Sequence, residues 1–155
     1  AVSRTAAGWA QAGVTRADGT ALADSVDLNM NGFILLPAGA GGPAFIAFDN
    51  FRAILKYNNS TAYALGIGLL SDQVAGRGKP LSKDWPRNER PLSLDERKAL
   101  QQALADAGYD PGPVDGIIGA GTRAALRKWQ IDHGMEPDGY ASAAAAAAIG
   151  TGHER

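Results

Sequence analysis

Residues 93–130 read SLDERKALQQALADAGYDPGPVDGIIGAGTRAALRKWQ, and this stretch decides the fold of the C-terminal part of the chain. Ser93 and Glu96 form the S-x-x-E pattern of a capping box, in which each side chain satisfies a backbone N–H at the start of a helix. Apolar side chains then recur three and four positions apart, at Leu100, Ala103, Leu104 and Ala107, which places them on one helical face. Gly108 follows, and glycine is favoured just past a helix end. The stretch therefore predicts a helix that begins at Ser93 and ends before Gly108.

Two more helices are predicted further along. A loop rich in proline and glycine follows the first helix at residues 109–121. The next apolar face, at helical spacing, consists of Thr122, Ala125, Leu126 and Trp129, and Gly134 ends that helix. The alanine run 143–148 with Ile149 predicts a third short helix that ends at Gly150. Residues 93–150 are thus expected to form an all-α three-helix domain.

The first 78 residues have a mixed pattern. A short helix is expected over Ser3–Ala12, and two strand-like runs, 33–37 and 44–48, flank a glycine-rich turn and predict a hairpin. A helix is expected over 51–57, and another from Ser60 onward. That last helix is expected to bury four apolar side chains, namely Tyr63, Ile67, Leu70 and Val74. The fold class is therefore α+β for this part, followed by an all-α domain.

A basic linker separates the two parts. Residues 79–92 carry four Lys/Arg and two Asp/Glu, whereas 1–78 carry five of each and 93–155 carry six and nine. Prolines and the absence of a periodic apolar face indicate a connecting segment. We expect domains at 1–78 and 93–150 with the linker at 79–92, and Trp85 packed onto one neighbouring domain.

Composition excludes several classes of function. A net charge of -1 gives no electrostatic footprint for nucleic acid. The chain has no cysteine and only two histidines, so a zinc site is not expected, and neither is any other cofactor. Residues 27–32 match the opening of a calcium loop, but its twelfth position is Ala38, so a turn is expected there and no metal site. No apolar run is long enough to span a bilayer, and the first ten residues lack a signal-peptide pattern.

Residues 97–130 resemble the peptidoglycan-binding module that is built on three helices. The match rests on fixed spacings between apolar, glycine and polar positions. These positions are Leu100, Leu104, Gly108, Tyr109, Pro113–Gly116, Gly119, Thr122–Ala125, Trp129 and Gln130. The resemblance implies that residues 93–150 bind peptidoglycan, both its glycan strands and its peptide stems.

Residues 33–74 resemble the C-terminal end of the catalytic domain in the lytic murein transglycosylase B family. The matching positions are Leu36–Gly39, Gly42–Phe45, Asn50–Phe51, Tyr57–Ser60 and Tyr63–Ala64. The resemblance implies a piece of a lysozyme-like domain and an enzyme of the bacterial periplasm or cell envelope. Enzymes of this family cleave the MurNAc–GlcNAc bond without water and leave a 1,6-anhydro sugar, with one glutamate as acid and then base.

This chain departs from the family at that glutamate. Its first glutamate is Glu89, inside the linker, and none occurs in residues 1–78. No catalytic residue is therefore assigned, and we expect the chain to be a C-terminal portion whose partner is the N-terminal catalytic portion. Two other interpretations stay open: a non-catalytic wall-binding protein, and a module that binds a target other than murein.

Two groups of residues are candidates for ligand contact. Tyr57, Asn58, Ser60 and Tyr63 offer the amide, hydroxyl and aromatic groups that an N-acetyl sugar needs. The structural alternative is that the asparagines end one helix, Ser60 caps the next, and both tyrosines lie in the core. In the module, the candidates for stem or sugar contact are Asp115, Thr122, Arg123 and Asp138. Their structural alternatives are a turn, a first helical turn and a solvated arginine.

Overall fold

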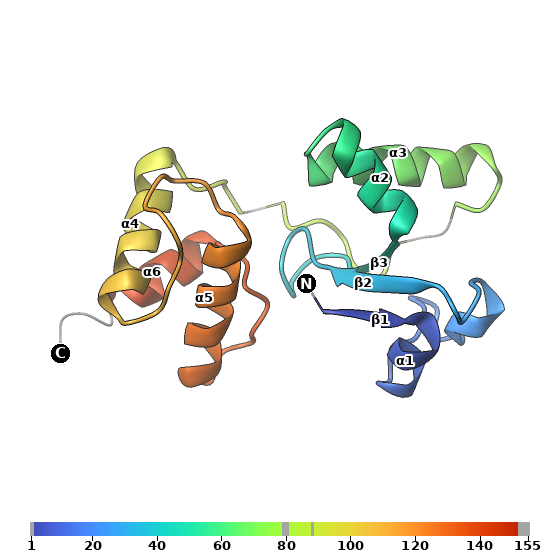
Figure 1. Ribbon diagram of the computed structural model, residues 1–155, viewed down its shortest axis with the longest axis horizontal. Helices are drawn as coiled ribbons and strands as arrows, with labels where there is room; N and C mark the ends of the chain where they lie inside the picture. The colour runs from blue at the N-terminus through green and yellow to red at the C-terminus, as the bar shows by residue number, and fades with distance from the viewer. Residues whose placement is uncertain (1, 79–80, 88, 152–155) are drawn as a thin grey trace. The chain divides into compact units, whose positions relative to one another are not determined.

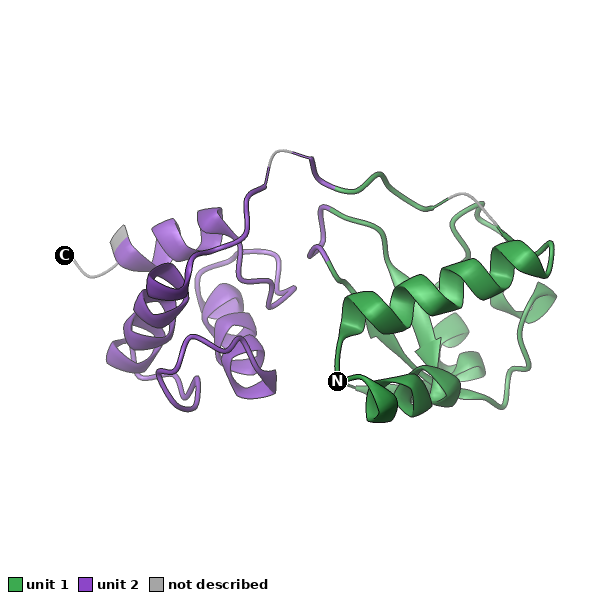
Figure 2. Cartoon of the chain, turned by 90° about the horizontal axis from the view of Figure 1, so that it is seen from above, with its two compact units in different colours: residues 1–37, 42–85 green, residues 38–41, 86–155 purple. Residues whose placement is uncertain are grey.

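The computed structural model describes residues 2–78, 81–87 and 89–151 of the 155-residue chain (Figure 1). The chain is divided into two compact units, which Figure 2 shows in green and purple. The first comprises residues 1–37 and 42–85, and the second comprises 86–155 together with 38–41. Residues 79, 80 and 88 of the predicted linker lie outside the described residues, and the limits 1–78, 79–92 and 93–150 stay a prediction. Within the described ranges, no helix is long and apolar enough to cross a membrane.

The first unit is built on a three-stranded antiparallel sheet. Its strands are β1 (Ser3–Thr5), β2 (Asn31–Leu35) and β3 (Phe45–Phe48), with β2 in the middle. The predicted hairpin is confirmed, and Phe33 pairs with Ala47 across it. Figure 1 shows α1 beside β1 and α2 beside β3. The helices are α1 (Ala6–Gln11), α2 (Asp49–Tyr57) and α3 (Thr61–Val74), and a short 3-10 helix covers Leu22–Asp24.

The expected helix over Ser3–Ala12 is wrong in its first three residues. Ser3–Thr5 pair with β2 instead, and α1 begins only at Ala6. Thr5 caps α1 by accepting a hydrogen bond from the N–H of Gly8 at 3.1 Å. These three residues form an edge strand although their local pattern favours a helix, because local propensity does not report pairing with the distant residues Asn31–Phe33.

The helix from Ser60 forms, but its expected burial is wrong. The only buried side chain of α3 is Ala64, which packs in a small core with Phe33, Ala47 and Phe51. Phe33 and Phe51 meet edge to face, with ring centroids 6.1 Å apart. The small Ala64 lets α3 approach this core closely. The apolar stripe instead faces outward, with exposed fractions of 40%, 38%, 62% and 83% for Tyr63, Ile67, Leu70 and Val74.

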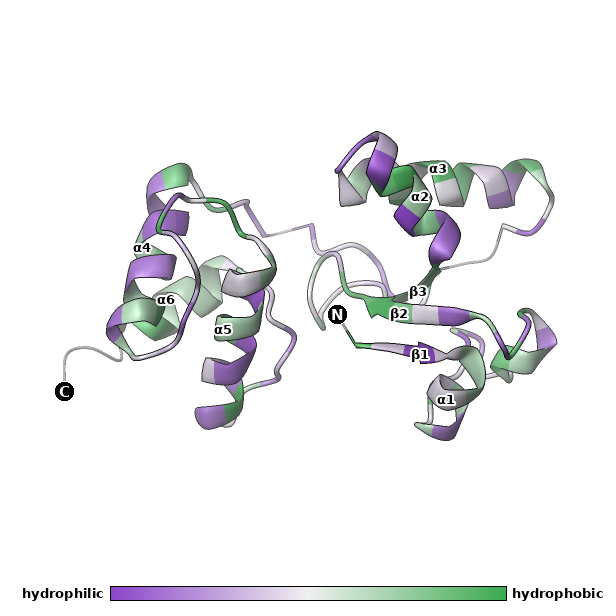
Figure 3. Cartoon of the chain, viewed as in Figure 1, coloured by the Kyte–Doolittle hydropathy of each residue, from purple (hydrophilic) through white to green (hydrophobic). Residues whose placement is uncertain are grey.

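The second unit is the predicted three-helix bundle. Its helices are α4 (Leu94–Asp106), α5 (Ala120–Asp132) and α6 (Ala143–Thr151). The capping box of Ser93 and Glu96 is confirmed, and Gly108 adopts a φ of +85° just past the end of α4. In Figure 3, α6 has the colour of hydrophobic residues, because it consists mainly of the alanine run. The buried core consists of Leu92, Leu100, Leu104, Ala125, Leu126, Trp129, Ala145 and Ile149. The mixed α+β fold class with an all-α C-terminal domain is confirmed.

Trp85, expected to pack onto a neighbouring domain, does so in the first unit. Its ring stacks on that of Phe45, with centroids 6.3 Å apart and an interplanar angle of 28°. Ser82 adds a polar contact nearby, because its hydroxyl oxygen accepts a hydrogen bond from the N–H of Ala44 at 3.3 Å. The segment 82–85 therefore lies against β3.

Candidate functional site

The junction between α2 and α3 presents the first group of candidates. Asn58 ends α2, where its N–H donates to the carbonyl of Ile54 at 3.0 Å, and its own carbonyl accepts from the N–H of Ser60 at 2.7 Å. The hydroxyl oxygen of Ser60 accepts from the N–H of Tyr63 at 3.2 Å and so caps α3. One helix thus ends and the next begins with only residues 58–60 between them, and these hydrogen bonds fix the backbone of the turn.

The two tyrosines of this junction are neighbours on the surface. Their ring centroids lie 6.4 Å apart with an interplanar angle of 31°. Tyr57 is 84% exposed and Tyr63 is 40% exposed, so neither is in the core. The side chains of Asn58 and Asn59 are also exposed, between the two rings in sequence. Paired aromatic faces next to carboxamides can stack on a sugar ring and hydrogen-bond its N-acetyl group.

The loop before α5 is organised by a buried carboxamide that the sequence interpretation missed. Gln101, which is 1% exposed, accepts a hydrogen bond from the N–H of Gly116 at 2.7 Å. Its Nε2 atom donates to Asp115 at 3.2 Å and to Thr122 at 3.2 Å. The Thr122 hydroxyl in turn donates to the carbonyl of Pro111 at 3.0 Å. Thr122 is buried here and binds the loop to α5, and its contact with a ligand stays a prediction.

Asp115 itself lies on the surface of this loop. Its carboxylate accepts the N–H of Ile117 at 2.7 Å. That hydrogen bond, and after it the one from Gln101, hold the pKa of the Asp115 carboxyl below its ordinary value. The side chain is therefore a charged, exposed carboxylate in a fixed turn.

Asp138 occupies a second turn with the same arrangement. One of its carboxylate oxygens accepts from Gln130 at 2.8 Å and from the N–H of Tyr140 at 2.9 Å. The other accepts from the N–H of Ala40 at 3.0 Å, a residue of the same unit. Gln130 is buried and accepts from the N–H of Gly139 at 2.8 Å. All of these contacts are structural, so Asp138 as a ligand contact stays a prediction.

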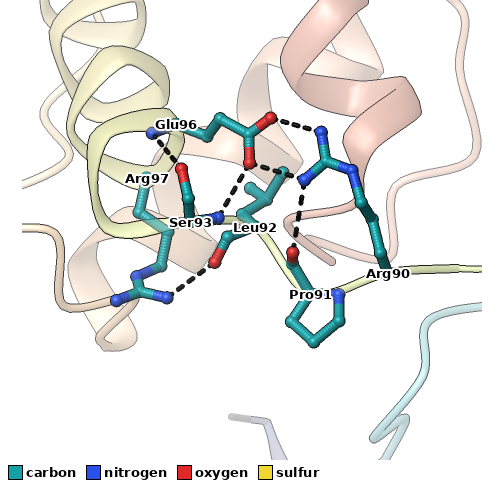
Figure 4. Close-up of polar contacts among 6 residues, drawn as sticks. All are labelled: Arg90, Pro91, Leu92, Ser93, Glu96 and Arg97. Carbon is teal, nitrogen blue, oxygen red and sulfur yellow. Dashed lines mark hydrogen bonds and ion pairs between the residues drawn. The ribbon is translucent and has the colours of Figure 1, made fainter.

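The entry into α4 is fixed by a second cluster of polar contacts (Figure 4). Arg90 donates from both terminal nitrogens to the carboxylate of Glu96, and Glu96 also accepts from the N–H of Ser93 at 2.8 Å. The hydrogen bonds from Arg90, and then that from Ser93, lower the pKa of Glu96 from 4.5 to about 2. Arg97 donates to the carbonyls of Leu92 at 2.8 Å and Gly116 at 2.6 Å. Glu96 is thus a structural carboxylate and has no feature of a proton donor.

Two other features of the second unit are a groove and an exposed arginine. A shallow groove of about 360 Å³ lies between α4 and α6, and half of its lining residues are alanines, while Arg90 and Glu96 also line it. Arg123 lies exposed on α5 and, within the described residues, forms no ion pair. Among the residues that the structure describes, no three His, Cys, Asp or Glu side chains come together in a way that could hold a metal ion.

Comparison with known families agrees with both parts of this arrangement. The model of the transglycosylase SLT domain matches residues 1–72, and the model described as a putative peptidoglycan binding domain matches residues 93–149. The chain therefore belongs to the transglycosylase SLT family in its first part and carries a peptidoglycan-binding domain in its second. The two resemblances seen in the sequence are confirmed.

Solved structures of one bacterial protein extend this assignment. Two crystal structures of SltB3 from Pseudomonas aeruginosa, in complex with NAG-anhNAM-pentapeptide and with NAG-NAM-pentapeptide, are each 44% identical to this chain, with a TM-score of 0.88. Each match covers 96% of this chain and 39% of SltB3, so the chain spans about two fifths of the length of that relative. A comparison with curated proteins found no match.

Proposed function

We propose that this chain forms the C-terminal portion of a peptidoglycan lytic transglycosylase, an enzyme that cleaves the MurNAc–GlcNAc bond without water and leaves a 1,6-anhydro sugar. The observation that carries the proposal is the order of two family matches in one chain, SLT domain and then peptidoglycan-binding domain. The similarity to SltB3, which was solved with an anhydro-sugar pentapeptide, supports the same reaction class.

In this proposal the α2–α3 junction supplies one wall of the sugar cleft. Tyr57 and Tyr63 present aromatic faces to a sugar ring, and Asn58 presents its amide to the N-acetyl group. Ser60 acts through the backbone by capping α3. The acid/base glutamate belongs to another portion of the enzyme, because residues 1–78 contain no glutamate.

The second unit tethers the enzyme to its insoluble substrate. Asp115 and Arg123 are the exposed polar candidates of the module, and the ligand is a glycan strand that carries peptide stems, as the ligands of the SltB3 complexes do. A tether raises the local concentration of substrate around the catalytic part. We place the enzyme in the bacterial periplasm or cell envelope, where this polymer lies.

A non-catalytic wall-binding protein is the second candidate, and the absence of glutamate from residues 1–78 favours it. The reading frame upstream of Ala1 separates the two. A helical segment that contains a glutamate and continues the SLT domain supports the enzyme. A frame without such a segment contradicts the enzyme and supports adhesion alone.

A further inference from the structure

Two arginines on α5 carry charge that the fold does not compensate. Arg123 and Arg127 are both exposed and lie four residues apart, so their side chains are neighbours on one helical face. The arginines that form ion pairs in the structure are Arg16, Arg52, Arg77 and Arg90. Across the described ranges, no carboxylate lies within ion-pair distance of Arg123 or Arg127. Two like charges at this spacing repel each other, and the repulsion lowers the stability of the helix.

The guanidinium group of Arg127 is nevertheless held in place. Its Nε atom donates to the carbonyl of Pro137 at 3.1 Å, and its Nη2 atom donates to the carbonyl of Asp138 at 3.2 Å. These are neutral acceptors, so the group is oriented but keeps its full charge. No hydrogen bond of its Nη1 atom is found within the described residues.

The turn at residues 137–139 lies directly against α5, next to the backbone of Arg123 and the side chain of Arg127. A Cβ atom at Gly139 would lie 2.7 Å from the carbonyl oxygen of Arg123 and 3.1 Å from Nη2 of Arg127. Gly139 also has a φ of +66°, where residues with a Cβ are strained. Only glycine permits this approach, and Gln130 fixes the same turn from inside. The guanidinium of Arg127 is therefore preorganised by a rigid part of the module.

We propose that Arg123 and Arg127 form a site for carboxylates of the peptide stem. The proposal rests on the peptidoglycan-binding function proposed above and names the part of the polymer that this face of the module binds. N-acetylated sugars are uncharged, whereas a peptide stem ends in a carboxylate. A planar guanidinium donates two parallel hydrogen bonds to a carboxylate, which gives both charge and geometry. Ile131, one turn further on, is exposed and offers apolar contact to the stem.

The test compares two ligands in equilibrium titrations with the 155-residue chain. One is NAG-NAM-pentapeptide, and the other is the same molecule with its carboxylates converted to amides. The wild-type chain is expected to bind the carboxylate form about tenfold more tightly, which corresponds to the loss of one charge-assisted hydrogen-bonded pair. Arg123→Gln is expected to remove most of that preference without changing the melting temperature, since the Arg123 side chain forms no hydrogen bond or ion pair within the described residues.

Arg127 and a neighbouring lysine complete the design. Arg127→Gln is expected to lose the preference as well, and Arg127→Lys to keep part of it, because the charge remains but the fork geometry is lost. Lys128→Gln removes the same charge from an adjacent exposed position of α5 and is expected to keep the preference. Equal binding of both ligands by the wild-type chain, or an equal effect of Lys128→Gln, overturns the proposal.

Sacculus binding separates this failure from failure of the proposed function. A wild-type chain that sediments with murein sacculi but binds neither soluble ligand retains the wall-binding function and has no stem-carboxylate site. A wild-type chain that does not sediment with sacculi refutes both.

Discussion

The side-chain carbonyl of Gln101 accepts a hydrogen bond from the N–H of Gly116 at 2.7 Å, and the same relationship recurs between Gln130 and Gly139 at 2.8 Å. In each case a buried glutamine on one helix holds an Asp-Gly turn that precedes the next helix. Each turn also has the same internal hydrogen bond, in which the N–H two residues further on donates to the aspartate carboxylate. The same hydrogen-bonding arrangement, a buried glutamine that binds an Asp-Gly turn, therefore occurs twice and fixes the two surface loops of the module.

Replacing Gln101 with leucine tests how much this hydrogen-bonding arrangement contributes to stability. The change keeps a side chain of similar size but leaves the N–H of Gly116 buried without an acceptor. A buried unsatisfied amide costs about 1–3 kcal/mol of the free energy of unfolding. Denaturant unfolding, followed through the indole NMR signal of Trp129 in the core of the module, measures the loss. The matched control is Gln102→Leu on the exposed side of α4, where only a contact with Asp106 is removed. Equal losses for the two variants would show that the buried carboxamide has no special role.

The pair between Arg90 and Glu96 predicts a dependence of stability on acid. The pKa of Glu96 falls from 4.5 to about 2 on folding, so the ionised form is the one that the fold stabilises. This contribution is complete above pH 4.5 and is lost as the pH falls toward 2. Glu96→Gln is therefore expected to lower the melting temperature at pH 7, and the difference from wild type should shrink across that window. Glu136→Gln, an exposed glutamate outside the four ion pairs of the described residues, is the control. A gap that stays constant from pH 7 to pH 2 contradicts the prediction.

The 155-residue chain is expected to bind murein sacculi without releasing 1,6-anhydro-muropeptides. Its first glutamate is Glu89, after the SLT match at residues 1–72, and Glu96 is held ionised by Arg90. Residues 1–72 therefore contain no glutamate that could protonate the glycosidic oxygen. Sedimentation measures binding, and chromatography of the soluble fraction measures cleavage, with SltB3 as the active comparison. Release of anhydro products by this chain at a rate above that of a mock purification overturns the expectation.

Much of the module could be predicted from its sequence, because its signals are local. The capping box at Ser93 and the glycine at 108 mark the ends of α4 through backbone geometry that needs no tertiary context. The polar network was missed because Gln101 and Gln130 are ordinary surface residues by type. Two Asp-Gly pairs, each downstream of a glutamine next to a buried apolar residue, were the available signal.

The structure of the first unit was harder to predict from the sequence, because its packing and pairing involve distant residues. Spacing correctly placed Tyr63, Ile67, Leu70 and Val74 on one face of α3, but it cannot say which face meets the core. The face of α3 that is buried is the one with Ala64, because its small side chain permits close approach to Phe33 and Phe51. Likewise, Ser3–Thr5 became a strand through pairing with distant residues, which no local pattern encodes.

Asn58 gives the sharpest test of the proposed sugar cleft. If the α2–α3 junction forms one wall of that cleft, the exposed amide of Asn58 orients the reacting sugar through its N-acetyl group. Asn58→Ala in the complete enzyme then removes one polar contact of about 1–3 kcal/mol, which lowers kcat/KM by roughly five- to 150-fold. The melting temperature should change little, because the backbone of residue 58 still donates to Ile54 and Ser60 still caps α3.

Asn59→Ala is the matched control for this experiment. Asn59 is the adjacent asparagine of the same turn and is also exposed, so its loss reports any general effect on the helix junction. If the junction has only a structural role, Asn58→Ala is expected to lower the melting temperature. Its activity is then expected to fall only as far as the folded fraction falls. The two quantities therefore have to be measured on both variants. An unchanged rate per folded molecule in Asn58→Ala would remove this turn from the sugar cleft, since a side chain that orients the substrate cannot be deleted without slowing the reaction it orients.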